Sequence, residues 1–581
     1  MKNQINLSPI KSTKPIPLYS SAQLYAMEQA WFVEGHDSFG LMKQAAWQMA
    51  QHIEQLYEQK QLNISSSATT YVPLRHMRQH RVSIWVGKGN NGGDGWLIAH
   101  YLQQMGWQVQ VVTVGFESDD FDTNDTTVFS DAQKALKEAL LANCPYQRFE
   151  NSACELEEGV DGNLQADVYI DALFGIGLDR APTGIYKTAI STFNKLSERN
   201  STLAIAVDIP SGLVASTGEV FEHVAIQADI TLCLIARKFG LHTKDGMDCS
   251  GKVIDIPLLP YPINDKSFMP VATLITTAYG LSPRRQNSYK GSYGHVLIIG
   301  GNRIDGSQGM GGAAILSASS SMAAGAGKIT VACHEAFHSA LLTSLPDAMT
   351  INLHDVDGVQ ELIKSATVIA IGMGLGRDEK AKVLFIKYLQ TAMTAKKAIV
   401  IDADGLYHLA SLQLEHHELV SQLREYGVNH QVCLTPHSGE TARLLNKRIS
   451  EVESNRLQAI KQCATTYGGE WVLKGAGSLI LEQGLDEHHV YVCAVGNAGM
   501  ATAGMGDVLS GVIAGLLAQQ DLSSGMQSLH QAVVIHGLAG DTLVNQSNNT
   551  WLVGQRGLQA QDMPAAIRHV MQLLINVYNY H

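Results

Sequence analysis

Short runs rich in β-branched and other apolar residues alternate with longer helical patterns along nearly the whole chain, and this alternation constrains the fold most. Buried parallel strands joined by crossover helices have this pattern. The first series of candidate strands comprises residues 82–86, 109–114, 168–173, 203–209 and 230–235. The second series comprises residues 295–299, 328–332, 367–371, 398–401, 431–434 and 471–473. The pattern predicts an α/β protein built on parallel sheets.

A polar, proline-containing stretch at residues 257–290 separates the two series. A chain of 581 residues is also too long for one ordinary hydrophobic core. Both observations predict two α/β domains, at residues 18–262 and 263–581. No repeat of fixed period stands out, so a repeat architecture is not expected.

Composition and charge exclude several classes of protein. The chain is 45% hydrophobic and 17% charged, which is typical of a globular protein rather than a disordered one. Its net charge of -12 disfavours nonspecific binding to nucleic acid or to an acidic membrane surface. Eight cysteines without a CxxC pair predict reduced thiols. No apolar signal core is present at the start and no run is long enough to span a bilayer, so we expect a cytoplasmic protein.

The strand at residues 82–86 runs directly into a glycine-rich turn, Gly87-Lys88-Gly89-Asn90-Asn91-Gly92-Gly93-Asp94-Gly95. Five glycines in a strand-to-helix turn let backbone amides approach a phosphate or another ligand closely. Asn90, Asn91 and Asp94 add oxygens that suit a hard cation or sugar hydroxyls. The turn formally contains G-x-G-x-x-G, but Glu117 is a poor candidate for the ribose-binding acid of a dehydrogenase. It therefore predicts a ligand site of a different kind from that of a classical dehydrogenase.

Two later strand ends carry similar groups. Asp171 precedes Gly175-Ile176-Gly177-Leu178, and Asp208 begins Asp208-Ile209-Pro210-Ser211-Gly212. The carboxyl ends of strands in an open parallel sheet converge on one crevice. We therefore expect these residues to meet the glycine-rich turn in one site. Three unrelated Asp-containing turns are the alternative.

Together with Lys238-Phe239-Gly240, these motifs resemble the epimerase domain of NAD(P)H-hydrate repair enzymes over about residues 18–257. The resemblance implies a Rossmann-like three-layer sandwich that interconverts the R and S hydrates of NADH and NADPH with a bound potassium ion. It implies potassium ligands at Asn91, Asp171 and Ser211. The hydrate-binding residues that it implies are Asn90, Asn91, Gly92, Gly93, Asp94, Gly175, Ile176, Gly177, Leu178, Asp179, Arg180, Ala181 and Asp208. Asp208 is also the expected acid or base, because inversion at the hydrated carbon requires proton movement.

In the second half, Gly504-Met505-Gly506-Asp507 opens an apolar run that extends to Ala518. If this run is a helix, its unpaired first amides and the positive end of its dipole point at any anion above the glycines. Asp507 would stand beside that anion and could accept a proton from a substrate hydroxyl that attacks phosphorus. A glycine turn whose Asp merely caps the helix is the alternative.

Four further loops follow candidate strands of the second half. Residues 372–376 form a glycine-rich turn, and Asp402 and Asp404 close the next strand with carboxylates that suit magnesium held through water, or helix capping. His437 and Glu440 follow a third strand. Residues 474–478 join two strands through a loop shaped for a nucleotide phosphate. With residues 504–507, these loops favour a phosphoryl-transfer site.

This set of loops resembles the ADP/ATP-dependent dehydratase domain of the same repair enzymes, from about Ile263 to the C-terminus. The resemblance implies a ribokinase-like α/β fold and the use of Mg²⁺ with ADP or ATP. The nucleotide-binding residues that it implies are Lys474, Gly475, Ala476, Gly477, Ser478 and Gly506. The residues implied to contact the hydrate are Ala314, Gly374, His437 and Asp507. Asp507 would deprotonate the hydroxyl that receives the phosphoryl group.

The sequence therefore predicts a bifunctional enzyme, with an epimerase followed by a nucleotide-dependent dehydratase that acts on the S hydrate. We expect small-molecule substrates, no nucleic-acid or membrane partner, and a homo-oligomer, for which the sequence carries no motif of its own. A vitamin or sugar kinase fused to a ligand-binding domain is one alternative. A nucleotide-sensing binding protein without turnover is another.

Overall fold

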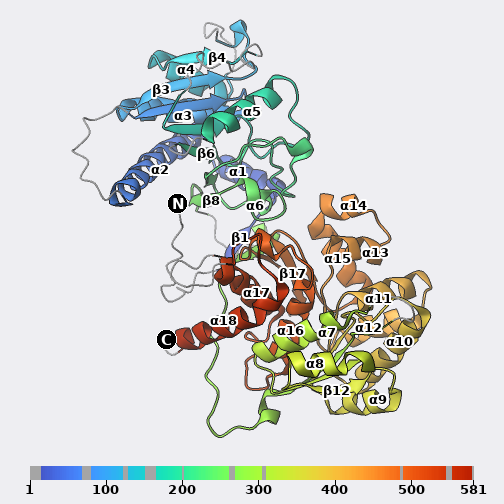
Figure 1. The fold of residues 1–581 in the computed structure, drawn as a ribbon. Coiled ribbons are helices and arrows are strands. Elements are labelled where there is room, and N and C mark those ends of the chain that lie inside the picture. The colour runs from blue at the N-terminus through green and yellow to red at the C-terminus, as the bar shows by residue number, and fades with distance from the viewer. Residues whose placement is uncertain are drawn as a thin grey trace. The chain divides into compact units, whose positions relative to one another are not determined.

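The computed structural model describes residues 15–67, 80–121, 129–150, 165–198, 202–260, 268–303, 309–483, 488–544 and 553–578. The chain divides into two compact units, Pro17–Ala272 and Thr273–His581, the latter grouped with Met1–Ile16. We call them the first and the second unit (Figure 1). Each unit contains one of the two series of strands that the sequence predicts, and the predicted α/β fold class is confirmed.

The first unit is built on a seven-stranded sheet in which every neighbouring pair is parallel. The spatial order is β4-β3-β2-β5-β6-β7-β8. The strands are β2 (Arg81–Val86), β3 (Gln108–Thr113), β4 (Tyr146–Arg148), β5 (Val168–Ala172), β6 (Leu203–Val207), β7 (Ile230–Leu234) and β8 (Lys252–Ile256). The order reverses between β2 and β5, and ligands of doubly wound sheets bind at such a switch point.

Helices cover both faces of this sheet (Figure 1). The α-helices are α1 (Ser21–Val33), α2 (Ser38–Ser67), α3 (Asn90–Gln104), α4 (Asp131–Leu141), α5 (Ile185–Ser197) and α6 (Gly246–Cys249). The 3₁₀ turns are η1 (Ser118–Phe121), η4 (Phe221–His223) and η5 (Phe239–His242). Along β2, Ile84 packs in the core made with α2, α3 and α4, whereas the next residue, Trp85, packs in the core made with α5. Alternate side chains of a strand point to opposite faces, so the unit is a three-layer sandwich.

The larger sheet has eleven strands among the described residues, in the order β1-β9-β18-β17-β16-β15-β14-β13-β10-β11-β12. Its strands are β1 (Ile16–Leu18), β9 (Ala272–Ile275), β10 (His295–Ile299), β11 (Lys328–Cys333), β12 (Met349–Asn352), β13 (Val368–Ile371), β14 (Ala398–Ile401), β15 (Val432–Leu434), β16 (Glu470–Leu473), β17 (Ser478–Gln483) and β18 (His488–Cys493). Strands β10 to β18 lie within the second unit, whereas β1 and β9 each contain a boundary between the two units. Strands β10 to β16 pair in parallel, and β17 is antiparallel to both of its neighbours. This sheet has its switch point between β10 and β13.

The α-helices of the second unit are α7 (Gly311–Ala323), α8 (His338–Ser344), α9 (Val356–Ser365), α10 (Glu379–Thr394), α11 (Asp404–Leu414), α12 (Glu418–Tyr426), α13 (Ser438–Leu444), α14 (Ile449–Ser454), α15 (Arg456–Tyr467), α16 (Met505–Ala518), α17 (Leu529–Val544) and α18 (Met563–Tyr578). Its 3₁₀ turns are η7 (Lys290–Tyr293), η8 (Glu335–Phe337), η9 (Ala498–Met500) and η10 (Ala560–Asp562). Among the helices in the described ranges, none has the length and apolarity needed to cross a membrane.

Helix α16 lies in the core and packs closely on α7. A Cβ added to Gly511 would lie 2.3 Å from the carbonyl oxygen of Ser317, and one on Gly515 would lie 2.6 Å from that of Ser321. The glycines Gly511 and Gly515 of α16 therefore allow the two helices to pack closely. Because Asp507 lies in the first turn of α16, this contact also fixes the position of its backbone.

The glycine-rich turn after β2 holds α3 equally close to the sheet. Gly92→Ala is expected to lower the free energy of unfolding by about 1–3 kcal/mol, because the added Cβ would lie 1.8 Å from the carbonyl oxygen of Gly87. Gly89→Ala is the matched control, since a Cβ there meets no atom within 4 Å, and a change of about 0.5 kcal/mol or less is expected. Urea denaturation of both full-length variants measures the difference. Equal losses in the two variants would contradict the close approach of α3.

Candidate functional site

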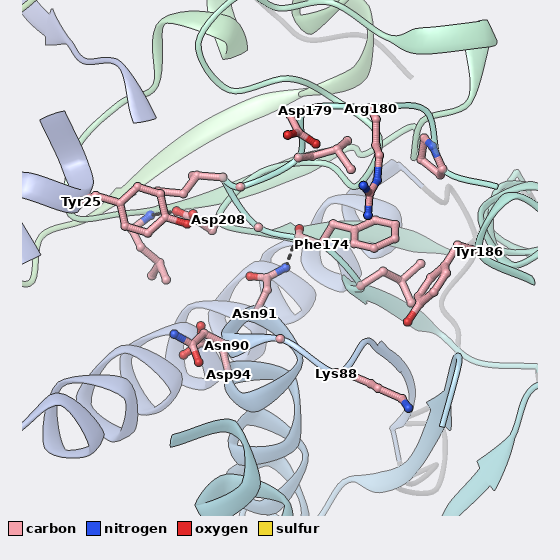
Figure 2. A pocket seen from close by; sticks show the side chains of 18 of the residues that line it. Tyr25, Lys88, Asn90, Asn91, Asp94, Phe174, Asp179, Arg180, Tyr186 and Asp208 are labelled. Carbon is pink, nitrogen blue, oxygen red and sulfur yellow. Dashed lines mark hydrogen bonds between the residues drawn. The ribbon is translucent and has the colours of Figure 1, made fainter. Parts of the chain in front are cut away.

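A cavity of about 670 Å³ opens at the carboxyl ends of β2, β5 and β6, at the switch point of the first sheet (Figure 2). The predicted residues that line it are Asn90, Asn91, Asp94, Gly175, Ile176, Gly177, Leu178, Asp179, Arg180, Ala181 and Asp208. Three loops that are far apart in the sequence therefore do meet. Gly92 and Gly93 are not among the lining residues, and each faces protein atoms instead, Gly92 the Gly87 carbonyl and Gly93 the Met42 side chain.

Asp208, which lines this cavity, forms a buried ion pair with Lys238. The Lys238 ammonium donates to Oδ1 of Asp208, and it also donates to the carbonyl oxygen of Leu234 at 2.8 Å. The backbone N–H of Leu234 donates to the same Asp208 oxygen at 3.0 Å. Burial opposes the charge on Lys238, but the Asp208 carboxylate outweighs it and raises the pKa of the lysine. Lys238 thus stays cationic beside Asp208.

The three predicted potassium ligands are joined through the backbone of Phe174. Its carbonyl oxygen accepts from Nδ2 of Asn91 at 2.8 Å, and its N–H donates to Oγ of Ser211 at 2.8 Å. Ser211 donates from Oγ and from its backbone N–H to Asp171, at 2.6 and 2.7 Å. Asp171 is fully buried, and burial raises its pKa to about 6 although these hydrogen bonds oppose the rise.

The cavity also contains two groups that the sequence analysis missed, Tyr25 and Glu28 of α1 (Figure 2 labels Tyr25, beside Asp208). Burial raises the pKa of Glu28, and the Asp208 carboxylate raises it further. The pKa of Asp94 lies well above its ordinary value for the same two reasons, with Glu28 adding to them. One signal could have identified Glu28: it lies four residues after the buried Leu24, on the packing face of its helix.

A second ion pair, between Asp402 and Lys474, lies at the carboxyl ends of β14 and β16 in the second unit. Nζ of Lys474 lies 2.9 Å from Oδ1 of Asp402, and Oγ of Ser510 donates to Oδ2 at 2.6 Å. The same ammonium lies 3.9 Å from Oε2 of Glu440. Asp402 is 1% exposed, so this pair is buried. Burial raises the pKa of Glu440 to about 7 against the opposing effect of Lys474.

The turn that begins α16 faces this ion pair. Gly504 adopts a left-handed conformation with φ of 90°, which favours glycine. A Cβ added to Gly506 would lie 3.0 Å from Nζ of Lys474 and 3.6 Å from Oδ2 of Asp402. Burial raises the pKa of Asp507 to about 7, the carboxylate of Asp402 raises it further, and Lys474 opposes the rise. The predicted base and the predicted phosphate loop are therefore neighbours.

Arg456 of α15 supports the loop at residues 474–478, a role that the sequence analysis missed. Its guanidinium is buried and donates to the carbonyl oxygens of Ala476 at 2.8 Å and of Leu473 at 3.1 Å. Oγ of Ser478 donates to the carbonyl oxygen of Gly475 at 3.0 Å and closes the turn. A lone arginine outside any motif gives no sequence signal for such a contact.

The remaining predicted residues of the second unit have different surroundings. His437 caps α13, because its Nδ1 accepts from the N–H of Gly439 at 3.0 Å, and its Nε2 lies 3.6 Å from Oε1 of Glu440. Gly374 has φ of 66°, and a Cβ there would lie 2.6 Å from the carbonyl oxygen of Met310. Ala314 is fully buried and has no surface for a ligand in this structure.

Two carboxylates proposed from the sequence for magnesium are already hydrogen-bonded. Asp402 is bound as described above, and Asp404 accepts from the N–H of Gly376 at 2.9 Å and from Nε of Arg377 at 2.7 Å. Within the described ranges, no group of three or more His, Cys, Asp or Glu side chains is arranged to hold a metal ion. The seven cysteines in those ranges are buried and free.

Comparisons with known proteins cover both units of the chain. A family model described as NAD(P)H-hydrate dehydratase matches residues 296–556, and one described as YjeF-related protein N-terminus matches residues 38–240. The bifunctional NAD(P)H-hydrate repair enzyme Nnr of Coxiella burnetii is 34% identical over 489 residues, which cover 83% of this chain and 88% of that protein. The enzyme of the same name from Escherichia coli strain K12 is 32% identical over 488 residues, 84% of each chain.

A solved ribokinase-like superfamily protein from Enterococcus faecalis V583 is 27% identical, with a TM-score of 0.42, and the match covers 51% of this chain and 92% of that one. The two family models match the two units in the order that the sequence predicts. The relatives match most of the length of both proteins. The chain therefore belongs to the family of bifunctional NAD(P)H-hydrate repair enzymes.

Proposed function

We propose that the two sites divide the repair of hydrated NADH and NADPH, with epimerisation in the first unit and nucleotide-dependent dehydration of the S hydrate in the second. One observation carries this proposal. Each site lies where parallel strands end and holds a buried Asp–Lys pair beside carboxyl groups whose pKa is raised. Paired carboxyl groups with different environments are suited to acid–base chemistry near neutral pH.

In the first unit, Asp208 is proposed to move the proton that inversion of the hydrated carbon requires. The hydrate would lie in the cavity against the glycine-rich turn and the loop at residues 175–181. Asp208 lines this cavity and is held in place there by its ion pair with Lys238. The cavity volume of about 670 Å³ lies within the range usual for small-molecule sites.

The donor atoms near Asp171 fit the potassium ion that the family implies. They are a carboxylate, the hydroxyl of Ser211, the side-chain amide of Asn91 and the carbonyl of Phe174, and oxygen donors of this kind suit hard cations. No Lys or Arg of the described residues forms an ion pair with Asp171, whose side chain is fully buried. A cation held by Asn91, Asp171 and Ser211 would supply the missing positive charge.

In the second unit, the loop at residues 474–478 and the amide of Gly506 are proposed to hold the phosphates of ADP or ATP. Asp507 would take the proton of the hydrate's hydroxyl as that oxygen attacks the terminal phosphorus. The phosphorylated oxygen is then a good leaving group, and the ring nitrogen lone pair expels it as inorganic phosphate. The neighbouring ring carbon then loses a proton to water, which forms the C=C bond of the reduced nicotinamide and restores the nitrogen lone pair. The raised pKa of Asp507 places this base near neutral pH.

Magnesium is proposed to arrive with the nucleotide phosphates. Asp402 is already paired with the Lys474 ammonium and Asp404 with the Arg377 guanidinium, so direct ligation of a second cation by these two carboxylates does not fit. Mg²⁺ often keeps several waters and binds through substrate phosphates. The cytoplasmic location and the homo-oligomer expected from the sequence stay predictions.

Replacing each proposed base by asparagine, one at a time, is expected to separate the two reactions. Asp507→Asn is expected to lower ADP-dependent restoration of reduced-nicotinamide absorbance about 100-fold or more, because the hydroxyl loses its base, and to leave epimer exchange intact. Asp208→Asn is expected to stop epimer exchange while the S hydrate is still dehydrated. Chromatographic separation of the epimers and absorbance measure the two rates. A phosphorylated product that accumulates would instead favour a kinase, and ligand binding without turnover would favour a sensor.

The buried Asp507 carboxylate also has a cost in stability. Its folded pKa of about 7 lies above the value of about 4 in an unfolded chain, so the folded state holds an extra proton between these pH values. The free energy of unfolding therefore falls as pH rises from about 4 to about 7. Asp507→Asn is expected to stabilise the chain, by an increment larger at pH 8 than at pH 5 by on the order of 2 kcal/mol. Asp521→Asn, at an exposed position, is the control in the same urea titrations. Equal increments for Asp507→Asn at both pH values would contradict the raised pKa of Asp507.

Potassium binding has a readout that does not depend on activity. Replacing lithium chloride with potassium chloride at equal ionic strength is expected to raise the thermal unfolding temperature of the first unit, because an ion that binds only the folded state stabilises it. Asp171→Asn removes the charged ligand and is expected to abolish the response. A response of unchanged size in this variant would show that the ion binds elsewhere.

A further inference from the structure

Glu28 lines the same cavity as Asp208 but belongs to α1, which carries no motif. Its helix is anchored by Leu24 and Met27, which are 1% and 3% exposed. Other titratable or charged groups near it are Tyr25, on its own helix, Asp94 of α3, Asp208 at the end of β6, and Lys238 before η5. Tyr25, Asp94 and Asp208 line the cavity with it, so the cluster is open to a bound substrate.

Glu28 and Asp208 have different surroundings. Asp208 accepts from the Lys238 ammonium and from the N–H of Leu234, and both contacts stabilise its charge. Glu28 forms no ion pair within the described ranges, and burial and the nearby Asp208 charge outweigh the weaker effect of Lys238 on its pKa. A carboxyl group whose pKa is raised and a carboxyl group paired with a lysine therefore line one cavity, and two carboxyl groups in such different environments suit general acid–base catalysis.

The hydrated nicotinamide carbon bears a hydroxyl and the ring nitrogen on the same atom. Neighbouring acid and base groups can serve both substituents from one side. Inversion by loss and return of the hydroxyl would instead require groups on opposite faces of the ring. The clustering of the carboxyl groups thus favours opening of the ring over loss of the hydroxyl.

We propose that Glu28 is the general acid of the epimerase site and acts together with Asp208 as the base. The inference rests on the epimerase function proposed for the first unit. Asp208 takes the hydroxyl proton, the C–O bond becomes C=O, and the C–N bond breaks with its electron pair going to nitrogen, which takes the proton of Glu28. Rotation about the adjacent C–C bond presents the other face of the aldehyde. Nitrogen then attacks the carbonyl carbon, its proton returns to Glu28, and Asp208 returns the other proton to oxygen, so both groups are restored.

Glu28 is assigned rather than Asp94 because of its exposure. Asp94 is 7% exposed and belongs to the helical turn that packs against the sheet, whereas Glu28 is half-buried at the cavity. A half-buried carboxyl group can both reach a substrate and exchange its proton with solvent.

The test measures epimerisation of the R hydrate by the full-length chain without ADP, across pH. Glu28→Gln is expected to lower kcat about 100-fold or more with KM within about threefold. The parent rate should fall as pH rises, because the acid loses its proton, and this fall should vanish in Glu28→Gln while the loss of rate at acid pH persists. Glu34→Gln, the same substitution at an exposed position after the same helix, is the matched control and should behave as the parent. Thermal unfolding and ADP-dependent dehydration of the S hydrate verify that Glu28→Gln is folded.

Four results would overturn the inference. Two concern the kinetics of Glu28→Gln: a kcat within about threefold of the parent, or a change in KM alone. The third is a fall in rate at high pH that vanishes in Asp94→Asn but not in Glu28→Gln. The fourth is uptake of ¹⁸O from solvent into the hydrate at the rate of epimerisation. Retention of the hydroxyl oxygen is the expected result in that last experiment. Asp208→Asn distinguishes failure of the proposed function from failure of the role of Glu28. If Asp208→Asn and Glu28→Gln both epimerise normally, the proposed function of the first unit fails. If Asp208→Asn is inactive and Glu28→Gln is active, only the role of Glu28 fails.

Discussion

The buried pairing of one aspartate with one lysine recurs in both units, and the arrangement of each site depends on it. Lys238 binds Asp208 in the first unit, and Lys474 binds Asp402 in the second. Removing either partner would leave an uncompensated buried charge, which is strongly destabilising. Because the two members of each pair come from different strand ends, the pair also holds two loops together. The fold thus provides the charge balance on which the chemistry depends.

Each pair has the same consequence for the carboxyl groups beside it. The lysine charge is largely satisfied by its partner, so burial raises the pKa of Glu28 and Asp94 in one unit and of Glu440 and Asp507 in the other. Proton donors and acceptors of intermediate strength result, at positions fixed by helices. The two units thus solve similar problems of proton transfer with unrelated loops. In the proposed mechanism, one set of carboxyl groups serves inversion of a carbon and the other serves activation of a hydroxyl.

The strands and site residues that could be predicted from the sequence are those that belong to a local sequence pattern. Buried parallel strands such as 82–86 and 398–401 show a continuous apolar run, and their terminal loops concentrate Gly and Asp, so the fold class and most of the cavity lining followed. The antiparallel strands β17 and β18 and the short edge strands gave weaker signals. Glu28 and Arg456 were missed because their roles depend on which distant loop each helix packs against. Gly92 and Ala314 show the converse, since a motif cannot separate a glycine or alanine needed for packing from one that touches a ligand.

The most direct test of the central claim is a carbon-13 NMR titration of the full-length chain labelled at the aspartate carboxyl carbons. We expect one resonance, absent in Asp507→Asn, to titrate with a midpoint near pH 7, and a second, absent in Asp94→Asn, to titrate above the ordinary range of aspartate. Midpoints near pH 4 for both, as in an exposed aspartate, would contradict the claim that the Asp–Lys pairs leave proton-bearing carboxyl groups beside them.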